Sequence, residues 1–294
     1  MNQNKWKHFV ILPENDGKKL LKFLKEIFVS YPLSLLYRLI RNKDIKINGA
    51  RTKDDKLVLK SGDVVEIFFA REIENNQNDE FKEAKPTFDV IYEDENILIV
   101  DKPVGISIHS EANCLDFQVL NYLKFKNIPG NFRPSHIGRI DKETSGIVLY
   151  AKSHSNLVQL NAKTKYFDKA YVFESDFESN NDIVCIDIVQ NGEKRDALIN
   201  PDSPICTKFT NLNNKKFAYI LTGKKHQIRL TLKALNTPIY GDKKYGGKSA
   251  KRMYLHSHQL TFHNLHDNLV YLNEKTFESK VPWEFKKESD VKNW

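Results

Sequence analysis

Apolar and polar positions in the first seventy residues follow helical spacing and then strand spacing. Over residues 19–28, apolar residues recur every three or four positions with lysines between them, which predicts an amphipathic helix. A second helix is predicted to begin near Ser34, a residue type that caps helix N-termini. Residues 45–47 alternate like a strand and enter an Asn48-Gly49 turn, and residues 64–69 form a further strand. The pattern predicts a small α/β module.

The rest of the chain is richer in strand patterns than in helical ones. Because the runs do not alternate regularly between strand and helix, we predict an α+β fold for this part. The predicted strands are 90–92, 97–100, 147–151, 171–174, 183–189 and 217–221, and the predicted helices are 116–124, 154–165 and 227–235.

A segment without periodicity separates the two parts. Residues 71–86 are rich in Asn and charged residues and end at Pro86. Such a segment buries too little apolar surface to order itself, so it is predicted to be a flexible linker. The expected organisation is a domain at 1–70, the linker, and a domain at 87–294.

The composition is that of a globular protein, with 40% apolar and 29% charged residues. No apolar run is long enough to span a membrane, and the N-terminus lacks the apolar core of a secretion signal. Cys114, Cys185 and Cys206 lie far apart without a Cys-x-x-Cys pair, which predicts three free thiols, no metal site and a cytoplasmic location. No Gly-x-x-x-x-Gly-Lys loop is present, so no cofactor is expected.

Positive charge is unevenly distributed along the chain. The net charge is +8, and residues 215–252 hold eleven Lys or Arg but a single acid, Asp242. Aromatic residues stand between these cations, a combination suited to phosphate contacts and base stacking. Residues 1–70 are also basic, with fourteen Lys or Arg and eight acids. The pattern favours a nucleic-acid partner, and the alternative is a solvated loop surface.

One carboxylate stands out among the candidates for catalysis. Asp141 follows Arg139, and a predicted Ser-Gly turn and an apolar strand follow it. A carboxylate beside a cation stays ionised at neutral pH and can act as a nucleophile or a base. The alternative is an ordinary exposed Asp in a loop.

Three further segments carry candidate chemistry. The first, at 92–106, contains a strand pattern followed by Lys102-Pro103 and Gly105. His109 lies beyond it and is a weaker candidate. The second is Lys169-Ala170-Tyr171, whose tyrosine, taken by itself, would more often be a core residue. The third, at 221–229, is basic and ends in Gln227-Ile228-Arg229.

Taken together and in this order, these segments resemble the RluA-type pseudouridine synthases. The resemblance covers residues 88–262 through four motifs, and it includes the closing segment at 254–262. It implies a mixed, mainly antiparallel sheet with flanking helices and a central catalytic cleft. It also implies a cofactor-free isomerase that converts uridine to pseudouridine in RNA. Gly138 and Thr231 depart from the common pattern of the family, at positions where histidine is frequent.

The resemblance assigns roles to individual residues. It makes Asp141 the nucleophile, Arg229 its ion-pair partner and Tyr171 the ring that packs against uracil. Arg139 takes the position that fills the stack left by a flipped base, since a planar cation can stack between bases. The remaining RNA-binding candidates of this domain are Lys224, Lys225, His226 and Gln227.

The N-terminal module resembles the RNA-binding domain first known from small-ribosomal-subunit protein S-four, over residues 16–70. Its candidate phosphate contacts include Arg38, Arg41 and Lys43. This module favours large-subunit ribosomal RNA as substrate, with transfer RNA as the alternative, and we expect a monomer. Two alternatives come from other functional classes: a non-catalytic RNA-binding assembly factor, and a glycosidase, which would need a second partnered acid.

Overall fold

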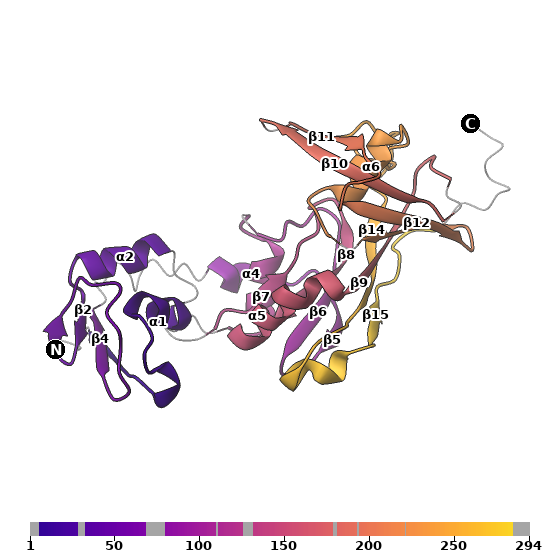
Figure 1. The fold of residues 1–294 in the computed structure, drawn as a ribbon. Helices are drawn as coiled ribbons and strands as arrows, with labels where there is room; N and C mark the ends of the chain where they lie inside the picture. The colour runs from indigo at the N-terminus through magenta and orange to yellow at the C-terminus, as the bar shows by residue number, and fades with distance from the viewer. Residues whose placement is uncertain are drawn as a thin grey trace. The chain divides into compact units, whose positions relative to one another are not determined.

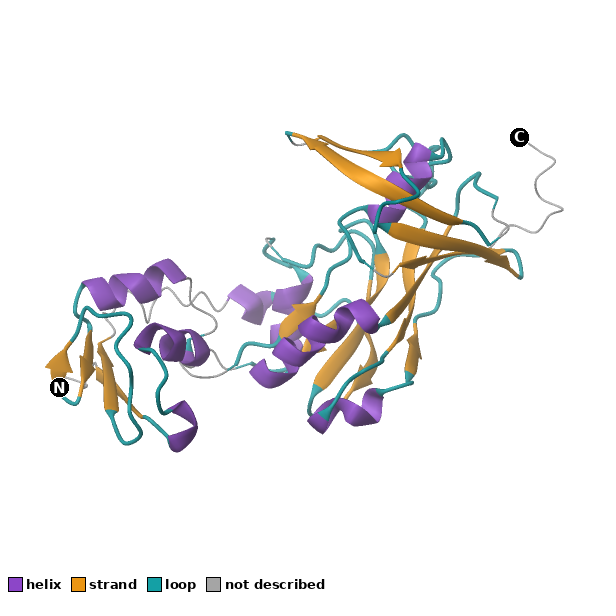
Figure 2. Ribbon diagram, viewed as in Figure 1, coloured by secondary structure: helices purple, strands orange, loops and turns teal. Residues whose placement is uncertain are grey.

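The computed structural model describes residues 6–28, 33–68, 80–109, 111–125, 132–178, 181–192, 194–220 and 222–284. Contacts within the chain divide it into two compact units. The first unit comprises Met1–Glu83 and Leu120–Arg133, and the second comprises Ala84–Val119 and Pro134–Trp294. Figure 1 labels most of their helices and strands, and Figure 2 distinguishes the two kinds of element by colour.

The first unit is an antiparallel four-stranded sheet in the order β1-β4-β2-β3, packed against two helices. Apolar residues from both helices and from the inner face of the sheet form one buried core. The elements are β1 (Trp6–Val10), α1 (Leu20–Ile27), α2 (Leu33–Arg41), β2 (Ile45–Ile47), β3 (Ala50–Arg51) and β4 (Val64–Phe68), with 3-10 helices at Pro13–Asn15 and Glu80–Glu83.

The two helices form because their apolar residues fall on one face. In α1, Leu20, Phe23 and Leu24 are buried, while the lysines between them are exposed. The predicted start of the second helix near Ser34 is confirmed, because α2 begins at Leu33. Ser34 is the second residue of this helix and not its N-cap. The Asn-Gly turn joins β2 to β3 as the sequence predicts.

The predicted linker is described only in part. Residues 71–79 lie outside the described residues, whereas Glu80–Glu83 form a 3-10 helix. Within that helix Phe81 is 3% exposed and its ring contacts the ring of Phe125. The flexibility of residues 71–86 stays a prediction.

The second unit is built on an eleven-stranded sheet flanked by a few short helices. Nine strands follow one another in the order β11-β10-β12-β13-β9-β14-β8-β6-β5, with β15 paired to β14 and β7 paired to β8. The strands are β5 (Asp89–Glu93), β6 (Ile97–Lys102), β7 (Ser135–Ile137), β8 (Ser145–Ala151), β9 (Asp168–Phe173), β10 (Ile183–Asn191), β11 (Lys194–Ile199), β12 (Cys206–Leu212), β13 (Lys215–Ile220), β14 (Leu255–Thr261) and β15 (Thr276–Glu278). The helices are α5 (His154–Lys163) and α6 (Gln227–Ala234), with 3-10 helices at Thr164–Tyr166 and Asp267–Leu272. The helix α4 (Leu115–Tyr122) belongs to this unit as far as Val119.

The pairing of β8 with β14 is the one parallel contact among the strand pairs of the described residues. It brings Gly146 so close to Ser257 that a Cβ on Gly146 would stand 2.2 Å from the Ser257 carbonyl oxygen. Ser145 and Gly146 are therefore the first two residues of β8, and the prediction of a Ser-Gly turn was wrong. Because the strand starts there, the loop that carries Asp141 ends against β14.

Two apolar clusters fix the helices of this unit on the sheet. One packs Leu160 of α5 against Ile147 and Leu149 of β8. The other packs Ile228 and Leu232 of α6 against β9, β12 and β13. Since α6 is held by this second cluster, its first turn has a fixed position beside β8 and β9. Among the described residues, no helix is long and apolar enough to cross a membrane.

The cysteines differ from the sequence-based expectation. Cys185 of β10 and Cys206 of β12 are paired residues on neighbouring strands and form a disulfide, while Cys114 is free and buried. The prediction of three free thiols was therefore wrong, because distance along the chain says nothing about strand register. The cytoplasmic location inferred from those thiols stays a prediction.

Candidate active site

A pocket of about 300 Å³ opens where β8, β9 and β14 meet the start of α6. Its wall includes the loop before β8, the loop before α6, and the inward side chains of the three strands. Asp141, Tyr171, His226 and Arg229 all line it, although they come from different segments of the sequence. The fold thus brings together the residues that the sequence motifs single out.

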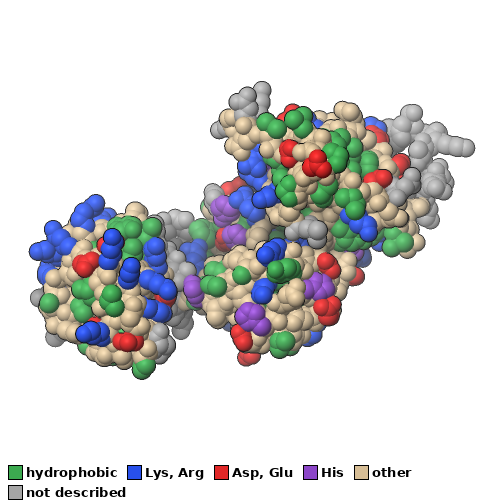
Figure 3. Space-filling view, in the orientation of Figure 1, with side chains coloured by type: hydrophobic (Ala, Val, Ile, Leu, Met, Phe, Trp, Pro, Cys, Tyr) green, Lys and Arg blue, Asp and Glu red, His purple; other side chains and the backbone are tan. Residues whose placement is uncertain are grey.

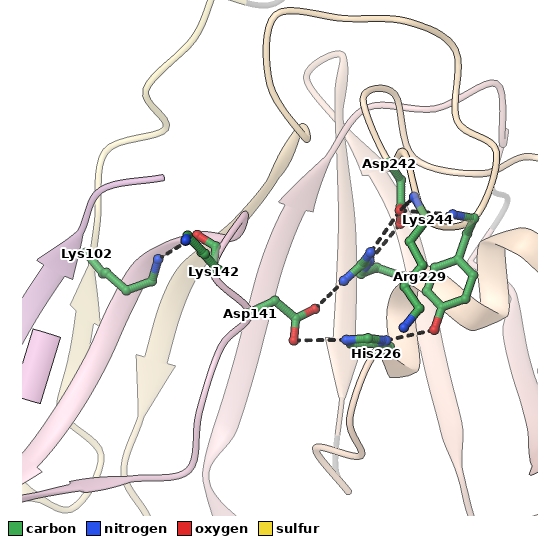
Figure 4. Close-up of polar contacts among 8 residues, drawn as sticks. Lys102, Asp141, Lys142, His226, Arg229, Asp242 and Lys244 are labelled. Atoms are coloured by element: carbon green, nitrogen blue, oxygen red, sulfur yellow. Dashed lines mark hydrogen bonds and ion pairs between the residues drawn. The ribbon is translucent and has the colours of Figure 1, made fainter. Parts of the chain in front are cut away.

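Asp141 lies in the turn between β7 and β8, and its carboxylate faces the first turn of α6 (Figure 4). Oδ2 accepts a hydrogen bond of 2.7 Å from Nη1 of Arg229. Oδ1 lies 3.4 Å from Nε2 of His226. The side chain is 20% exposed, so the carboxylate is held by protein on one side and open to the pocket on the other.

Arg229 is shared between two carboxylates. Its Nε and Nη2 donate to the two oxygens of Asp242 at 2.7 and 2.8 Å, and its third donor, Nη1, is directed at Asp141. Burial by itself lowers the pKa of Arg229, but the hydrogen bonds and charge of Asp242, together with Asp141, outweigh it and raise that pKa. Arg229 is therefore a permanent cation inside the protein.

Asp242 is a functional candidate that the motif analysis missed. It is 1% exposed, and its Oδ1 also accepts from the backbone N–H groups of Lys244 and Tyr245. A signal for it was present in the sequence, because Asp242 is the single acid among eleven cations over residues 215–252. An isolated carboxylate in such a segment needs a structural reason, and its contact with Arg229 supplies one.

The side chain of Gln227, predicted to contact RNA, is buried in the protein. Its Oε1 accepts from the Thr222 hydroxyl at 2.8 Å and from the Lys224 backbone N–H at 3.0 Å. Its Nε2 donates to the Cys206 carbonyl at 2.9 Å. Gln227 therefore fastens the loop before α6 to β12, and this loop presents the exposed Lys224 and Lys225 at the pocket.

Tyr171 extends from β9 into the pocket near Asp141. Burial raises the pKa of its phenol to about 12, the charge of Asp141 adds to this rise, and a hydrogen bond with Ser257 opposes it. The phenol is consequently neutral near pH 7 and offers a ring face rather than a base. This agrees with the stacking role that the resemblance implies.

The remaining cationic candidates are exposed. Arg139 lines the pocket mouth, beside Gly138, whose φ of +65° is a left-handed conformation that glycine adopts without strain.

Thr231, the other residue that departs from the family pattern, is buried within α6, where its hydroxyl donates to the Gln227 carbonyl. In the first unit, Arg38, Arg41 and Lys43 are exposed, and Lys and Arg side chains cover much of the face seen in Figure 3.

Lys102 supports the loop that follows Asp141. Its ammonium donates to the carbonyls of Pro103, Ile106 and Lys142 at 2.9, 2.8 and 3.1 Å, and Figure 4 shows the last of these contacts. Burial lowers the pKa of Lys102 to about 7, against the opposing charges of Glu143 and Asp141.

His109, the weaker candidate of the sequence analysis, stacks on the ring of His136, with ring centroids 6.0 Å apart. Among the described residues, no three His, Cys, Asp or Glu side chains are grouped to hold a metal ion.

The sequence of this chain is similar to those of known proteins. Residues 96–234 match the family model for RNA pseudouridylate synthase. The chain is 37% identical over 300 residues to an uncharacterized RNA pseudouridine synthase of Mycoplasma capricolum, covering 94% of this chain and 98% of that one. It is 28% identical over 280 residues to the ribosomal large subunit pseudouridine synthase C of Haemophilus ducreyi, covering 86% and 87%.

The fold of this chain is also similar to that of a protein whose structure has been solved. The human RNA pseudouridylate synthase domain containing 4 superposes with a TM-score of 0.53 at 20% identity, over 66% of this chain and 88% of that one. This likeness supports the α+β fold, while the match to the Mycoplasma protein extends over almost the whole of both sequences. The chain therefore belongs to the RNA pseudouridine synthase family, whose members are isomerases.

Proposed function

We propose that Asp141 is the nucleophile of this enzyme and that the substrate is a uridine in large-subunit ribosomal RNA. The observation that carries the first part is the position of its carboxylate, which is paired with a permanent cation and yet opens into the pocket. A carboxylate fixed in this way is held in one orientation and has one oxygen directed away from Arg229.

The proposed reaction is an isomerisation without any co-reactant. Asp141 attacks the target nucleotide at the anomeric carbon of ribose or at carbon 6 of the uracil ring. The bond between N1 and the ribose breaks, the base rotates, and carbon 5 forms the new bond to the ribose. Carbon 5 then loses its proton and N1 gains one, and the carboxylate is released, so atoms and charges balance.

Tyr171 and Arg139 would handle the base during this sequence. The target must leave its helical stack before Asp141 can reach it, and a planar guanidinium can fill the gap. Arg139 is exposed at the pocket mouth, which suits this task. The neutral ring of Tyr171 would pack against the uracil inside the pocket, where aromatic stacking is sequence-tolerant.

Two observations support ribosomal RNA as the substrate. The Haemophilus relative is named for the large ribosomal subunit, and the chain covers 87% of it. The first unit is basic and presents exposed cations on α2, which would bind phosphates of a structured RNA and add affinity. We further propose that residues 16–70 act as an S-four-like RNA-binding domain and that the enzyme works as a monomer.

The nucleophile is tested by Asp141→Asn, which keeps the shape of the side chain and removes its charge. This variant should form pseudouridine at less than about 1% of the wild-type rate while binding RNA normally, since a neutral amide is not a nucleophile here. Asp202→Asn makes the same chemical change in an exposed loop and serves as the control. Substantial turnover by Asp141→Asn would remove Asp141 from the mechanism.

The substrate is tested by mapping pseudouridines in ribosomal and transfer RNA from cells with and without the gene. Loss of one or more sites in large-subunit ribosomal RNA is the expected result. Loss confined to transfer RNA would overturn the substrate assignment and leave the nucleophile untouched. Light scattering of the purified protein tests the monomer.

A further inference from the structure

The two oxygens of the Asp141 carboxylate have different neighbours. Oδ2 is occupied by the Arg229 guanidinium at 2.7 Å, whereas Oδ1 faces Nε2 of His226 at 3.4 Å. The His226 side chain is 8% exposed, so most of its surface is covered by protein. This is an unusual position for a residue whose task is to contact RNA from outside.

The second nitrogen of His226 is also occupied. Nδ1 lies 2.7 Å from the hydroxyl of Tyr245, which is 7% exposed. A tyrosine hydroxyl can donate to Nδ1, and in that arrangement the remaining proton of a neutral imidazole is on Nε2. The Tyr245 ring also lies under the Arg229 guanidinium, 5.0 Å from its centroid, so one aromatic residue supports both partners of Asp141.

The backbone of His226 adds an independent observation. His226 immediately precedes α6 with φ 61° and ψ 19°, a left-handed conformation. Residues other than glycine adopt this conformation only at a cost in free energy, and such residues cluster at functional sites. Its side chain makes no capping hydrogen bond with α6, so helix capping does not account for the conformation.

We propose that His226 is a positioning residue that holds Oδ1 of Asp141 through its Nε2–H, with Tyr245 fixing the tautomer. The proposal rests on Asp141 being the nucleophile. The separation of 3.4 Å is longer than a hydrogen bond, and we expect it to shorten when RNA fills the pocket, as catalytic contacts commonly do on substrate binding. Asp141 would then have a donor on each oxygen, and its attacking direction would be fixed.

The electrostatic surroundings favour the neutral imidazole that this role needs. Burial lowers the pKa of His226 to about 4; the charge of Asp141 opposes this, and the charges of Arg229, Lys244 and Lys225 add to it. The imidazole is therefore uncharged at neutral pH, where Nε2–H is a neutral donor. His226 would not act as a proton carrier.

The experiment compares His226→Gln with His226→Asn in the full-length enzyme. A Gln amide can place an N–H near the position of Nε2, whereas an Asn amide is too short to reach Asp141. We expect His226→Asn to lower the single-turnover rate by roughly tenfold to a hundredfold, the scale for one hydrogen bond to a charged group, with little change in RNA affinity. His226→Gln should retain clearly more activity.

The pH–rate profile separates positioning from a general structural role. Losing a donor disfavours the charged carboxylate, so the acidic limb of the profile should move to higher pH in His226→Asn and less in His226→Gln. Tyr245→Phe keeps the ring and removes the hydroxyl, and it should move the profile in the same direction. The Tyr245→Phe variant also tests the proposal if His226→Asn does not fold. His266→Gln, a change at an exposed histidine, is the control.

Each other result has a distinct meaning. Wild-type rates and profile with weakened RNA binding in His226→Asn would make His226 an RNA contact, as the sequence predicts, and would overturn the proposal. Equal losses of single-turnover rate in His226→Gln and His226→Asn, with an unshifted pH–rate profile, would show that His226 has only a structural role. Activity in Asp141→Asn would instead overturn the proposed nucleophile, whatever the His226 variants do.

Discussion

Arg229 gives Asp242 two of its donors and Asp141 only one. Two N–H donors of the guanidinium therefore bind the buried carboxylate of Asp242, whereas the carboxylate of Asp141 in the pocket accepts a single hydrogen bond from it. Asp242 fixes the plane of Arg229, and that plane determines where Nη1 places Asp141. The arrangement anchors Asp141 at Oδ2, while Oδ1 faces His226 and the pocket.

Asp242→Asn should destabilise the protein and slow catalysis. The change leaves a buried guanidinium without its main counter-charge, and breaking a buried pair in this way costs about 3–5 kcal/mol. We expect a fall of that size in the free energy of unfolding, measured by urea denaturation, together with a reduced single-turnover rate. Asp202→Asn should stay within about 0.5 kcal/mol of wild type. An equally stable Asp242→Asn would show that Asp242 is dispensable for placing Arg229.

Arg229→Lys should lose most of the activity although it keeps the charge. An ammonium is a point charge on a flexible chain, so it cannot donate to Asp242 and Asp141 in the fixed directions of the fork. We expect a single-turnover rate lower by at least about tenfold, which is about 1.4 kcal/mol in the barrier. Arg195→Lys on β11 is the matched control. Unchanged rates in Arg229→Lys would limit Arg229 to an electrostatic contact.

Local elements were predictable from sequence because their causes are local. The helix α1 follows from the spacing of Leu20, Phe23 and Leu24, and the turn between β2 and β3 follows from the dipeptide Asn-Gly. The start of β8 was not predictable in the same way. Gly146 looks like a turn residue in sequence, and only the approach of Ser257 from the parallel neighbour β14 explains it.

The site was predictable as a set of residues but not as a set of contacts. Resemblance to a family indicated Asp141, Tyr171 and Arg229, and all three line one pocket. It did not indicate that Gln227 points inward or that Asp242 takes the guanidinium fork. Both facts depend on how α6 packs against neighbouring segments, and a pattern along one stretch of chain does not contain that information. The catalytic roles themselves stay proposals.

The cations on and directly after α2 should control the salt dependence of RNA binding. Arg38, Arg41 and Lys43 are exposed, and removing a cation that binds a phosphate lowers the slope of log affinity against log salt by about one. Replacing all three with Gln should therefore weaken binding and flatten the salt dependence, as measured by titrations at several salt concentrations. Lys280→Gln, an exposed cation of the second unit, is the control. Identical slopes would show that these three residues do not bind the RNA.

A buried histidine outside the pocket predicts how stability depends on pH. His256 of β14 is 0% exposed, and its Nδ1 lies 2.9 Å from the Ser145 hydroxyl. Arg252 donates to the same hydroxyl at 2.6 Å, so the proton of Ser145 is available for Nδ1 of His256. The hydroxyl of Ser279 lies 3.0 Å from Nε2 and donates to Asp101, so Nε2 carries a proton and Nδ1 of the neutral imidazole accepts from Ser145.

Acidification should destabilise the protein through this residue. Burial lowers the pKa of His256 from its ordinary value of 6.5 to about 4. Between these two values the unfolded chain takes up a proton that the folded protein refuses, so the free energy of unfolding falls as the pH falls. The slope is about 1.4 kcal/mol per pH unit for each such group, and the lowered pKa of His226 acts in the same direction.

The variant His256→Gln isolates this contribution, because it removes the titrating group. Its free energy of unfolding, measured by urea denaturation from pH 7 down to pH 4, should start below that of wild type, since the substitution removes one hydrogen bond from a buried chain of such bonds. Its decline with falling pH should be shallower by about 1.4 kcal/mol per pH unit, because the unfolded chain has one proton fewer to gain. His266→Gln makes the same substitution at an exposed position and serves as the control. Parallel curves for wild type and His256→Gln would mean that the folded protein accepts a proton at His256, which requires the hydrogen bond with Ser145 to reverse its direction.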